Sequence, residues 1–99
     1  MAQFDVFVNP IGRGYLLDVQ ADILRDLKTR LVVPLMLATD VPSGVKRLHP
    51  EFEIAGRRTI MATQLMAAIP ADELQDFVSS LAPERYVIMG AIDFLLGGI

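Results

Sequence analysis

The sequence predicts a mainly β protein that ends in one helix. Short runs of strand-favouring residues separated by Pro and Gly turns occupy most of the chain. The last sixteen residues, Glu84 to Ile99, instead carry apolar side chains at helical spacing. A chain of 99 residues can bury one modest core, so we expect a single domain over residues 1–99.

The amino-acid composition limits the kinds of function that this chain can have. Hydrophobic residues make up 53% of the chain, above the roughly 45–50% of an average soluble domain. A small domain cannot bury all of this surface alone, which favours homo-oligomerisation. The net charge of −3 argues against direct nucleic-acid binding, which depends on clustered Lys and Arg. No secretory signal or membrane span is evident, so we expect a cytoplasmic protein.

Residues for catalysis are scarce. The chain has no cysteine and one histidine, His49, which lies in a predicted loop beside Pro50. A disulfide, a thiol nucleophile, a zinc cluster and a nucleophilic triad are therefore not expected, nor is any cofactor. These features predict a protein that is not an enzyme, although a metal-independent ribonuclease using Arg, Thr and carboxylates stays open.

The first half reads as strands and turns. Phe4–Val8 and Tyr15–Gln20 are predicted strands of an antiparallel hairpin, joined by the turn Asn9–Gly14. Arg30–Leu35 is the clearest strand, and Pro34 predicts a sheet edge, a bulge or a strand end.

The segment Ala21–Thr29 suits a turn-rich connection or a single helical turn. Its residues Ile23 and Leu24 either pack inward or form an exposed step. A second loop, Asp40–Gly44, precedes a basic trio that we interpret as solvated: Lys46, Arg47 and His49.

The second half of the chain gives a less definite prediction of secondary structure. Phe52–Ile60 predicts a hairpin turning at Ala55-Gly56. We expect exposed pairing between the charges that flank this turn: Arg57 and Arg58 with Glu51 and Glu53. Met61–Ile69 fits either strand or helix, and Ala71–Leu81 carries a helical stripe.

The final helix is predicted to start with Pro83 in its first turn and to end at Gly97 and Gly98. Gly90 costs about 1 kcal/mol in a helix interior unless another backbone approaches it closely. Apolar residues cover a wide arc, which predicts a second contact surface besides the core: Val87, Ile88, Ala91, Ile92, Leu95 and Leu96.

Four segments resemble the CcdB toxins of bacterial toxin–antitoxin modules, and the match runs in order from Gln3 to Ile99. They are DVQADIL at Asp18–Leu24, TRLVVPL at Thr29–Leu35, MATQLMAAIP at Met61–Pro70 and AIDFLLGGI at Ala91–Ile99.

The resemblance implies an SH3-like β-barrel of the CcdB and MazF kind with a long C-terminal helix, assembled as a homodimer. For residues 71–81 it favours a strand and loop. It also implies a toxin that binds the A subunit of DNA gyrase and traps the enzyme on cleaved DNA. A cognate antitoxin would neutralise the toxin and form with it a repressor of their operon.

The resemblance further implies which residues contact gyrase. The helix end supplies Asp93, Gly97, Gly98 and Ile99, and the pair Ile23 and Leu24 is expected close to that tip.

One position departs from the family pattern. The best-known member has tryptophan where this chain has Gly97, and losing an aromatic hot-spot anchor costs about 2–4 kcal/mol. Two alternatives therefore stay open: a diverged member that binds an antitoxin without poisoning gyrase, and an endoribonuclease toxin of the related fold that uses Arg57 or Arg13.

Overall fold

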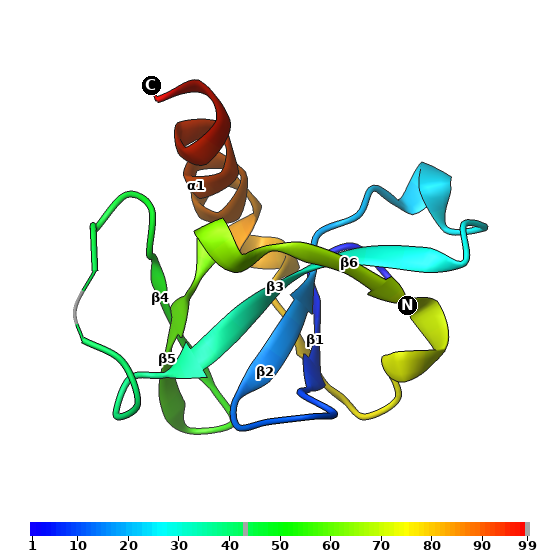
Figure 1. Ribbon diagram of the computed structural model, residues 1–99, viewed down its shortest axis with the longest axis horizontal. Helices are drawn as coiled ribbons and strands as arrows, with labels where there is room; N and C mark the ends of the chain where they lie inside the picture. Colours follow the sequence, from blue (N-terminus) through cyan, green and yellow to red (C-terminus); the bar gives the residue numbers. More distant parts are fainter. Residues whose placement is uncertain (43, 99) are drawn as a thin grey trace.

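The computed structural model describes residues 1–42 and 44–98 and shows a curled β-sheet with one helix rising from it (Figure 1). Within these residues the strands are β1 (Asp5–Val8), β2 (Tyr15–Asp18), β3 (Thr29–Leu37), β4 (Glu51–Ile54), β5 (Arg57–Met61), β6 (Ala67–Pro70) and β7 (Phe77–Ser80). Short 3-10 helices are η1 (Asp22–Leu24), η2 (Thr63–Leu65), η3 (Ala71–Glu73) and η4 (Ala82–Glu84), and the α-helix is α1 (Arg85–Gly97).

The strands form an antiparallel half-barrel in the order β4-β5-β3-β2-β1-β7, and β6 also pairs with β3. The prediction of a mainly β body with a C-terminal helix is confirmed. The predicted N-terminal hairpin is present as β1 and β2, with Val6 opposite Leu17. The predicted second hairpin is present as β4 and β5. Its turn residues Ala55 and Gly56 have φ of 51° and 77°, the left-handed geometry of a tight hairpin turn.

Strand β3 is the spine of the sheet. One edge pairs with β2, while the other pairs with β6 through Thr29–Val32 and then with β5 through Leu35–Leu37. Pro34 lies between these two partners. The prediction that Pro34 marks an edge, a bulge or a strand end was therefore wrong. Its missing N–H is tolerated inside the strand because the ladder partner changes there.

Both undecided segments are now assigned. Met61–Ile69 contains the end of β5, the turn η2 and most of β6. Ala71–Leu81 is a turn, a loop and strand β7, as the family resemblance favoured, rather than a helix. Pairing of β7 with β1 decides the outcome, since Ser80 lies opposite Asp5 and a helix could not supply this edge.

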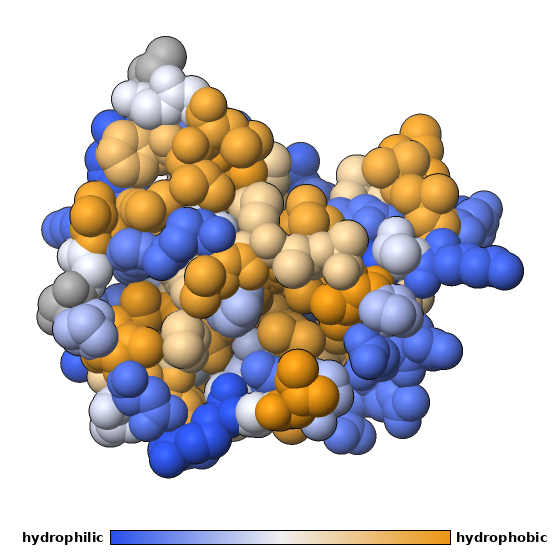
Figure 2. Space-filling view, viewed as in Figure 1, coloured by the Kyte–Doolittle hydropathy of each residue, from blue (hydrophilic) through white to orange (hydrophobic). Residues whose placement is uncertain are grey.

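The core lies inside the curl, between the sheet and α1. Its fully buried members include Val6, Leu17, Val33, Leu35, Ile54, Met61 and Ile88. Hydrophobic side chains also remain on the surface, above all along α1 and at η1 (Figure 2).

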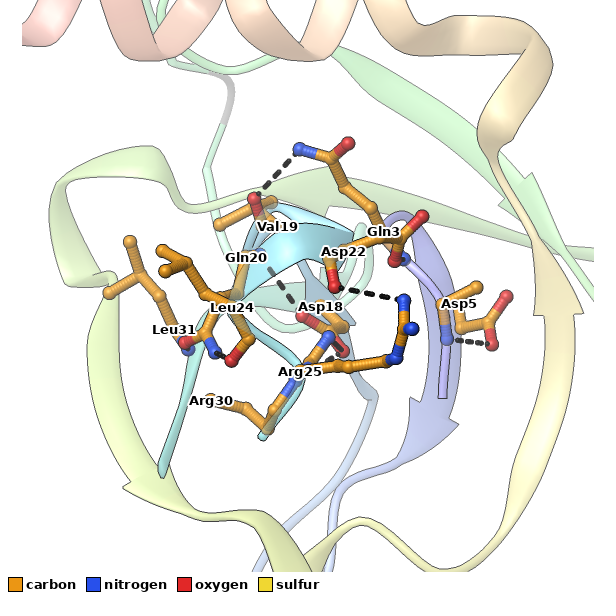
Figure 3. A network of polar contacts seen from close by, with 11 residues as sticks. Gln3, Asp5, Asp18, Val19, Gln20, Asp22, Leu24, Arg25, Arg30 and Leu31 are labelled. Carbon is orange, nitrogen blue, oxygen red and sulfur yellow. Dashed lines mark hydrogen bonds and ion pairs between the residues drawn. The ribbon is translucent and has the colours of Figure 1, made fainter. Parts of the chain in front are cut away.

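One ion pair is buried inside the sheet. Arg30 Nε and Nη2 donate to Asp18 Oδ2 at 2.9 and 2.6 Å, and the Gln20 backbone N–H donates to Asp18 Oδ1 at 3.0 Å (Figure 3). Both charged side chains are almost fully shielded from solvent. Burial raises the pKa of the Asp18 carboxyl above its ordinary value, and the hydrogen bonds from Arg30 oppose that rise.

We predict that Asp18→Ala lowers the free energy of unfolding by about 3–5 kcal/mol, because the Arg30 charge is then buried without a partner. The double variant Asp18→Leu with Arg30→Met should recover most of this loss, since apolar replacement of a whole buried pair is often neutral. Urea unfolding measures both.

The matched control is the exposed pair in which Arg58 Nε donates to Glu51 Oε1. Glu51→Ala should leave the unfolding midpoint almost unchanged, because exposed ion pairs contribute little. Equal losses for Asp18→Ala and Glu51→Ala would contradict the role assigned to the buried pair.

Candidate binding face at the C-terminal helix

Helix α1 is anchored by one narrow face. Ile88 and Ala91 are buried in the core, while Tyr86 on the opposite side is 87% exposed. The helix begins later than predicted, at Arg85. Pro83 lies in the preceding 3-10 turn η4, because its fixed φ suits that turn as well as a helix start.

Two arginine contacts link the helix to the rest of the fold. Arg85 Nη1 donates to Gln3 Oε1 at 3.1 Å, and its guanidinium lies 5.5 Å from the Phe4 ring centroid. Nearer the other end, the Arg47 guanidinium lies 4.5 Å from the Phe94 ring centroid, a cation–π contact. The direction of α1 is thereby fixed at both ends.

The tip of α1 is open. Leu96 is 76% exposed, and Asp93, Gly97 and Gly98 are exposed as well. Gly98 adopts a left-handed conformation with φ of 71°, and its N–H donates to the Phe94 carbonyl at 2.8 Å, which ends the helix. The predicted site residue Ile99 lies outside the described residues.

The turn η1 presents the other two predicted residues to solvent. Ile23 is 87% and Leu24 48% exposed, so of the two alternatives the exposed step is correct. Gln20 holds the turn: its Nε2 donates to the Leu24 carbonyl at 3.0 Å, and its Oε1 accepts from the Leu31 N–H at 3.1 Å (Figure 3).

Gln3 connects this turn to the helix. Its backbone N–H donates to Asp22 Oδ1 at 2.7 Å and its Nε2 donates to the Val19 carbonyl at 3.1 Å, while its Oε1 accepts from Arg85. Sequence patterns did not reveal this role, because a single glutamine carries no periodic signal.

Within one chain, η1 and the tip of α1 stand apart. Both rise from the same side of the half-barrel, η1 at the right and the helix end at the left of Figure 1, with β6 passing between them. The expectation that Ile23 and Leu24 lie close to the tip is therefore not met inside a single copy.

An apolar surface fills the space between these two projections (Figure 2). Its exposed members are small or aliphatic and come from three elements: Leu96 of α1, Leu65, Ala67 and Ala68 of η2 and β6, and Ile23 of η1. We call this set the saddle. The sequence pattern indicates the helical part of the saddle, but it does not distinguish strand from helix at β6.

Groups suited to chemistry lie elsewhere and are mostly engaged. Arg13 pairs with Asp40 at 3.1 Å, Arg58 pairs with Glu51, and His49 Nε2 lies 2.8 Å from Gln64 Oε1. Across residues 1–42 and 44–98, no group of three or more His, Cys, Asp or Glu side chains is placed to hold a metal ion. In the same residues no helix is long and apolar enough to cross a membrane.

Several solved structures share this fold. Similar solved structures include an endoribonuclease in complex with its cognate antitoxin from Mycobacterial species, with a TM-score of 0.79, 15% identity, and coverage of 98% of this chain and 95% of that chain. Mycobacterium tuberculosis toxin MazF-mt6 has a TM-score of 0.78 and 13% identity, with coverage of 93% of this chain and 95% of that chain. MazE-MazF from Deinococcus radiodurans has a TM-score of 0.65 and 16% identity, with coverage of 97% of this chain and 93% of that chain.

At these identities the likeness establishes the fold, which is that of MazF-like toxins. The sequence itself matches the family described as CcdB protein over residues 3–98. The chain therefore belongs to the CcdB family and is a toxin of a toxin–antitoxin system. The predicted family and the predicted fold, a mainly β body of the CcdB and MazF kind with a C-terminal helix, are both confirmed, while the homodimer stays a prediction.

The glycines of α1 generate a test of this geometry. A Cβ added to Gly90 meets no atom within 4 Å, so Gly90→Ala should raise the free energy of unfolding by about 1 kcal/mol through helix propensity alone. Gly98→Ala should lower it by about 1–2 kcal/mol, because the left-handed conformation penalises a side chain.

Thermal unfolding at low protein concentration measures both changes. Destabilisation by Gly90→Ala would contradict an open helix face at Gly90 and would indicate that another backbone lies against it.

Proposed function

We propose that this CcdB-family toxin binds the A subunit of DNA gyrase through the end of α1 and traps the gyrase–cleaved DNA complex. The exposed tip of α1 carries this proposal, because Leu96, Gly97 and Gly98 offer an apolar side chain beside bare backbone. On this proposal the protein acts by binding and not as an enzyme. In support, the side chains of Arg13, Arg58 and His49 are already bonded to neighbouring side chains.

The proposed binding unit is a homodimer that uses the saddle. A two-fold axis repeats each patch, so a second copy seated on Ala67 and Ala68 contributes its own helix end and its own η1. Small side chains on β6 allow close backbone approach. This arrangement offers a way to unite Ile23 and Leu24 with a tip that they do not reach within one chain.

A cognate antitoxin is the second proposed partner. The family supports it, and one structural relative was solved in complex with its own cognate antitoxin. The antitoxin neutralises the toxin and, together with it, represses their operon. Because gyrase acts on chromosomal DNA, the proposed site of action is the cytoplasm.

The gyrase proposal is tested by supercoiling and cleavage assays with purified gyrase. The intact chain should yield linear cleaved DNA, whereas a variant lacking Gly97, Gly98 and Ile99 should not, because it has lost the tip. Ile23→Ala should weaken inhibition at least about tenfold, the effect of losing 1.4 kcal/mol at an interface.

Ile11→Ala is the matched control, since Ile11 is 92% exposed but lies in the β1–β2 loop, on the far side of the half-barrel from the tip (Figure 1). It should inhibit like the intact chain. If the folded intact chain neither inhibits gyrase nor yields cleaved DNA, the gyrase proposal fails. Capture of the antitoxin by that same preparation would then support the diverged family member.

The dimer has its own test. Ala68→Glu places a charge in the saddle and should convert the dimer to a monomer in sedimentation at micromolar concentration, because a buried unpaired charge is costly. Ala82→Glu, at an exposed alanine that precedes α1, should leave the dimer intact. A monomeric intact chain at that concentration would refute the saddle as a dimer contact.

Ribonuclease activity is the second candidate, and one feature favours it. Thr39, Arg57 and Arg58 line a pocket of about 320 Å³. Arg58 already binds Glu51, so Arg57 is the arginine of this pocket best placed for a phosphate. RNA cleavage by the intact chain that Arg57→Ala abolishes would replace the gyrase proposal with this one.

A further inference from the structure

The turn before β4 is closed by its own histidine. The Val45 N–H donates to His49 Nδ1 at 2.9 Å, and the N–H groups of Leu48 and His49 donate to the Val45 carbonyl at 3.0 and 2.7 Å. A ring nitrogen that accepts a hydrogen bond carries no proton. These contacts assign a neutral imidazole protonated at Nε2, which donates to Gln64 Oε1 of η2 at 2.8 Å.

The closed turn packs tightly over this ring. A Cβ added to Gly44 would overlap His49 Nδ1, so the chain passes directly over the imidazole. Gly44 and His49 both line a largely apolar cavity of about 310 Å³, together with residues that include Met36, Ile60 and Leu65. The position of the His49 ring therefore couples the turn to the cover of an apolar cavity.

We propose that His49 is a proton-operated latch for the turn Val45–His49. Protonation places an N–H on Nδ1 that faces the Val45 N–H, and two donors cannot bond to each other. The Val45–His49 ring bond is then lost and the Val45 N–H is released beside the cavity, while the two bonds to the Val45 carbonyl do not depend on this proton. Imidazole is the side chain suited to such a change between about pH 5 and 8.

The charges around the ring come from three elements. Lys46 lies on the same turn, Glu51 begins β4 and Glu84 precedes α1, and all three line a second cavity of about 580 Å³ together with His49. The neighbours from β5 and η2, Ile60 and Gln64, carry no charge. One positive and two negative groups therefore share this cavity with the ring, and of the two carboxylates Glu51 is already paired with Arg58.

The latch also reaches the helix that carries the proposed binding face. Arg47 belongs to the same turn, and its guanidinium lies over the Phe94 ring of α1. The latch itself stands on the contacts of His49 alone and does not depend on gyrase binding.

Amide hydrogen exchange measured by NMR tests the latch on the full chain. The protection factor of the Val45 amide, which corrects for the intrinsic pH dependence of exchange, should fall about tenfold between pH 7.5 and 5.5. That factor corresponds to about 1.4 kcal/mol, the upper range for one hydrogen bond. Ring ¹⁵N shifts should show the Nε2–H tautomer at pH 7.5.

Two variants separate the latch from general loosening of the fold. His49→Asn keeps an oxygen acceptor near the Nδ1 position but cannot titrate, so Val45 should stay protected at both pH values. His49→Phe has no acceptor, and Val45 should exchange rapidly at both. Equal protection of Val45 in the intact chain at the two pH values, or an equal loss in His49→Asn, would overturn the proposal.

Discussion

The buried pair of Asp18 and Arg30 is the interaction on which the candidate face depends. It joins β2 to β3 within the stretch of β3 that pairs with β6, and Asp18 lies only five positions before Ile23. A slip of one residue in strand pairing would turn one of the two charges to the other face of the sheet. Burial makes that alternative costly, so the pair selects one register, and Gln20 then transmits it to η1 through its own hydrogen bonds.

The second constraint is the narrow attachment of α1. Only Ile88 and Ala91 are fully buried, while much of the remaining apolar circumference stays open. Such a helix is stable because the half-barrel supports one face and the two arginine contacts fix its direction. Because so little of α1 is buried, Leu96 projects into solvent. An exposed apolar side chain of this kind is unfavourable in a monomer but suits a protein that binds a partner.

Local signals explain what the sequence could predict. The Ala55-Gly56 turn, the first hairpin and the final helix each follow from residues close together in the chain. The conformation of Ala71–Leu81 and the position of Pro34 depend on distant strands, which no local pattern reports. The candidate site was likewise predictable only in part. Family motifs indicated its apolar residues, whereas the hydrogen bond from Arg85 to Gln3 joins residues 82 positions apart and could not be found from spacing.

The structure bears on Gly97, the position at which the best-known family member has tryptophan. Burying a leucine side chain contributes roughly 1.5–3 kcal/mol, comparable with the loss of about 2–4 kcal/mol at an aromatic hot spot. Leu96 directly precedes Gly97 and is already exposed, so it offers an apolar anchor about 100° around the helix from the absent ring. Under the proposed function, glycine in place of tryptophan therefore moves the apolar anchor to Leu96 more than it removes an anchor. If the proposed function holds, a redirected anchor changes which gyrase surface fits, because α1 cannot rotate to compensate while Ile88 and Ala91 remain in the core.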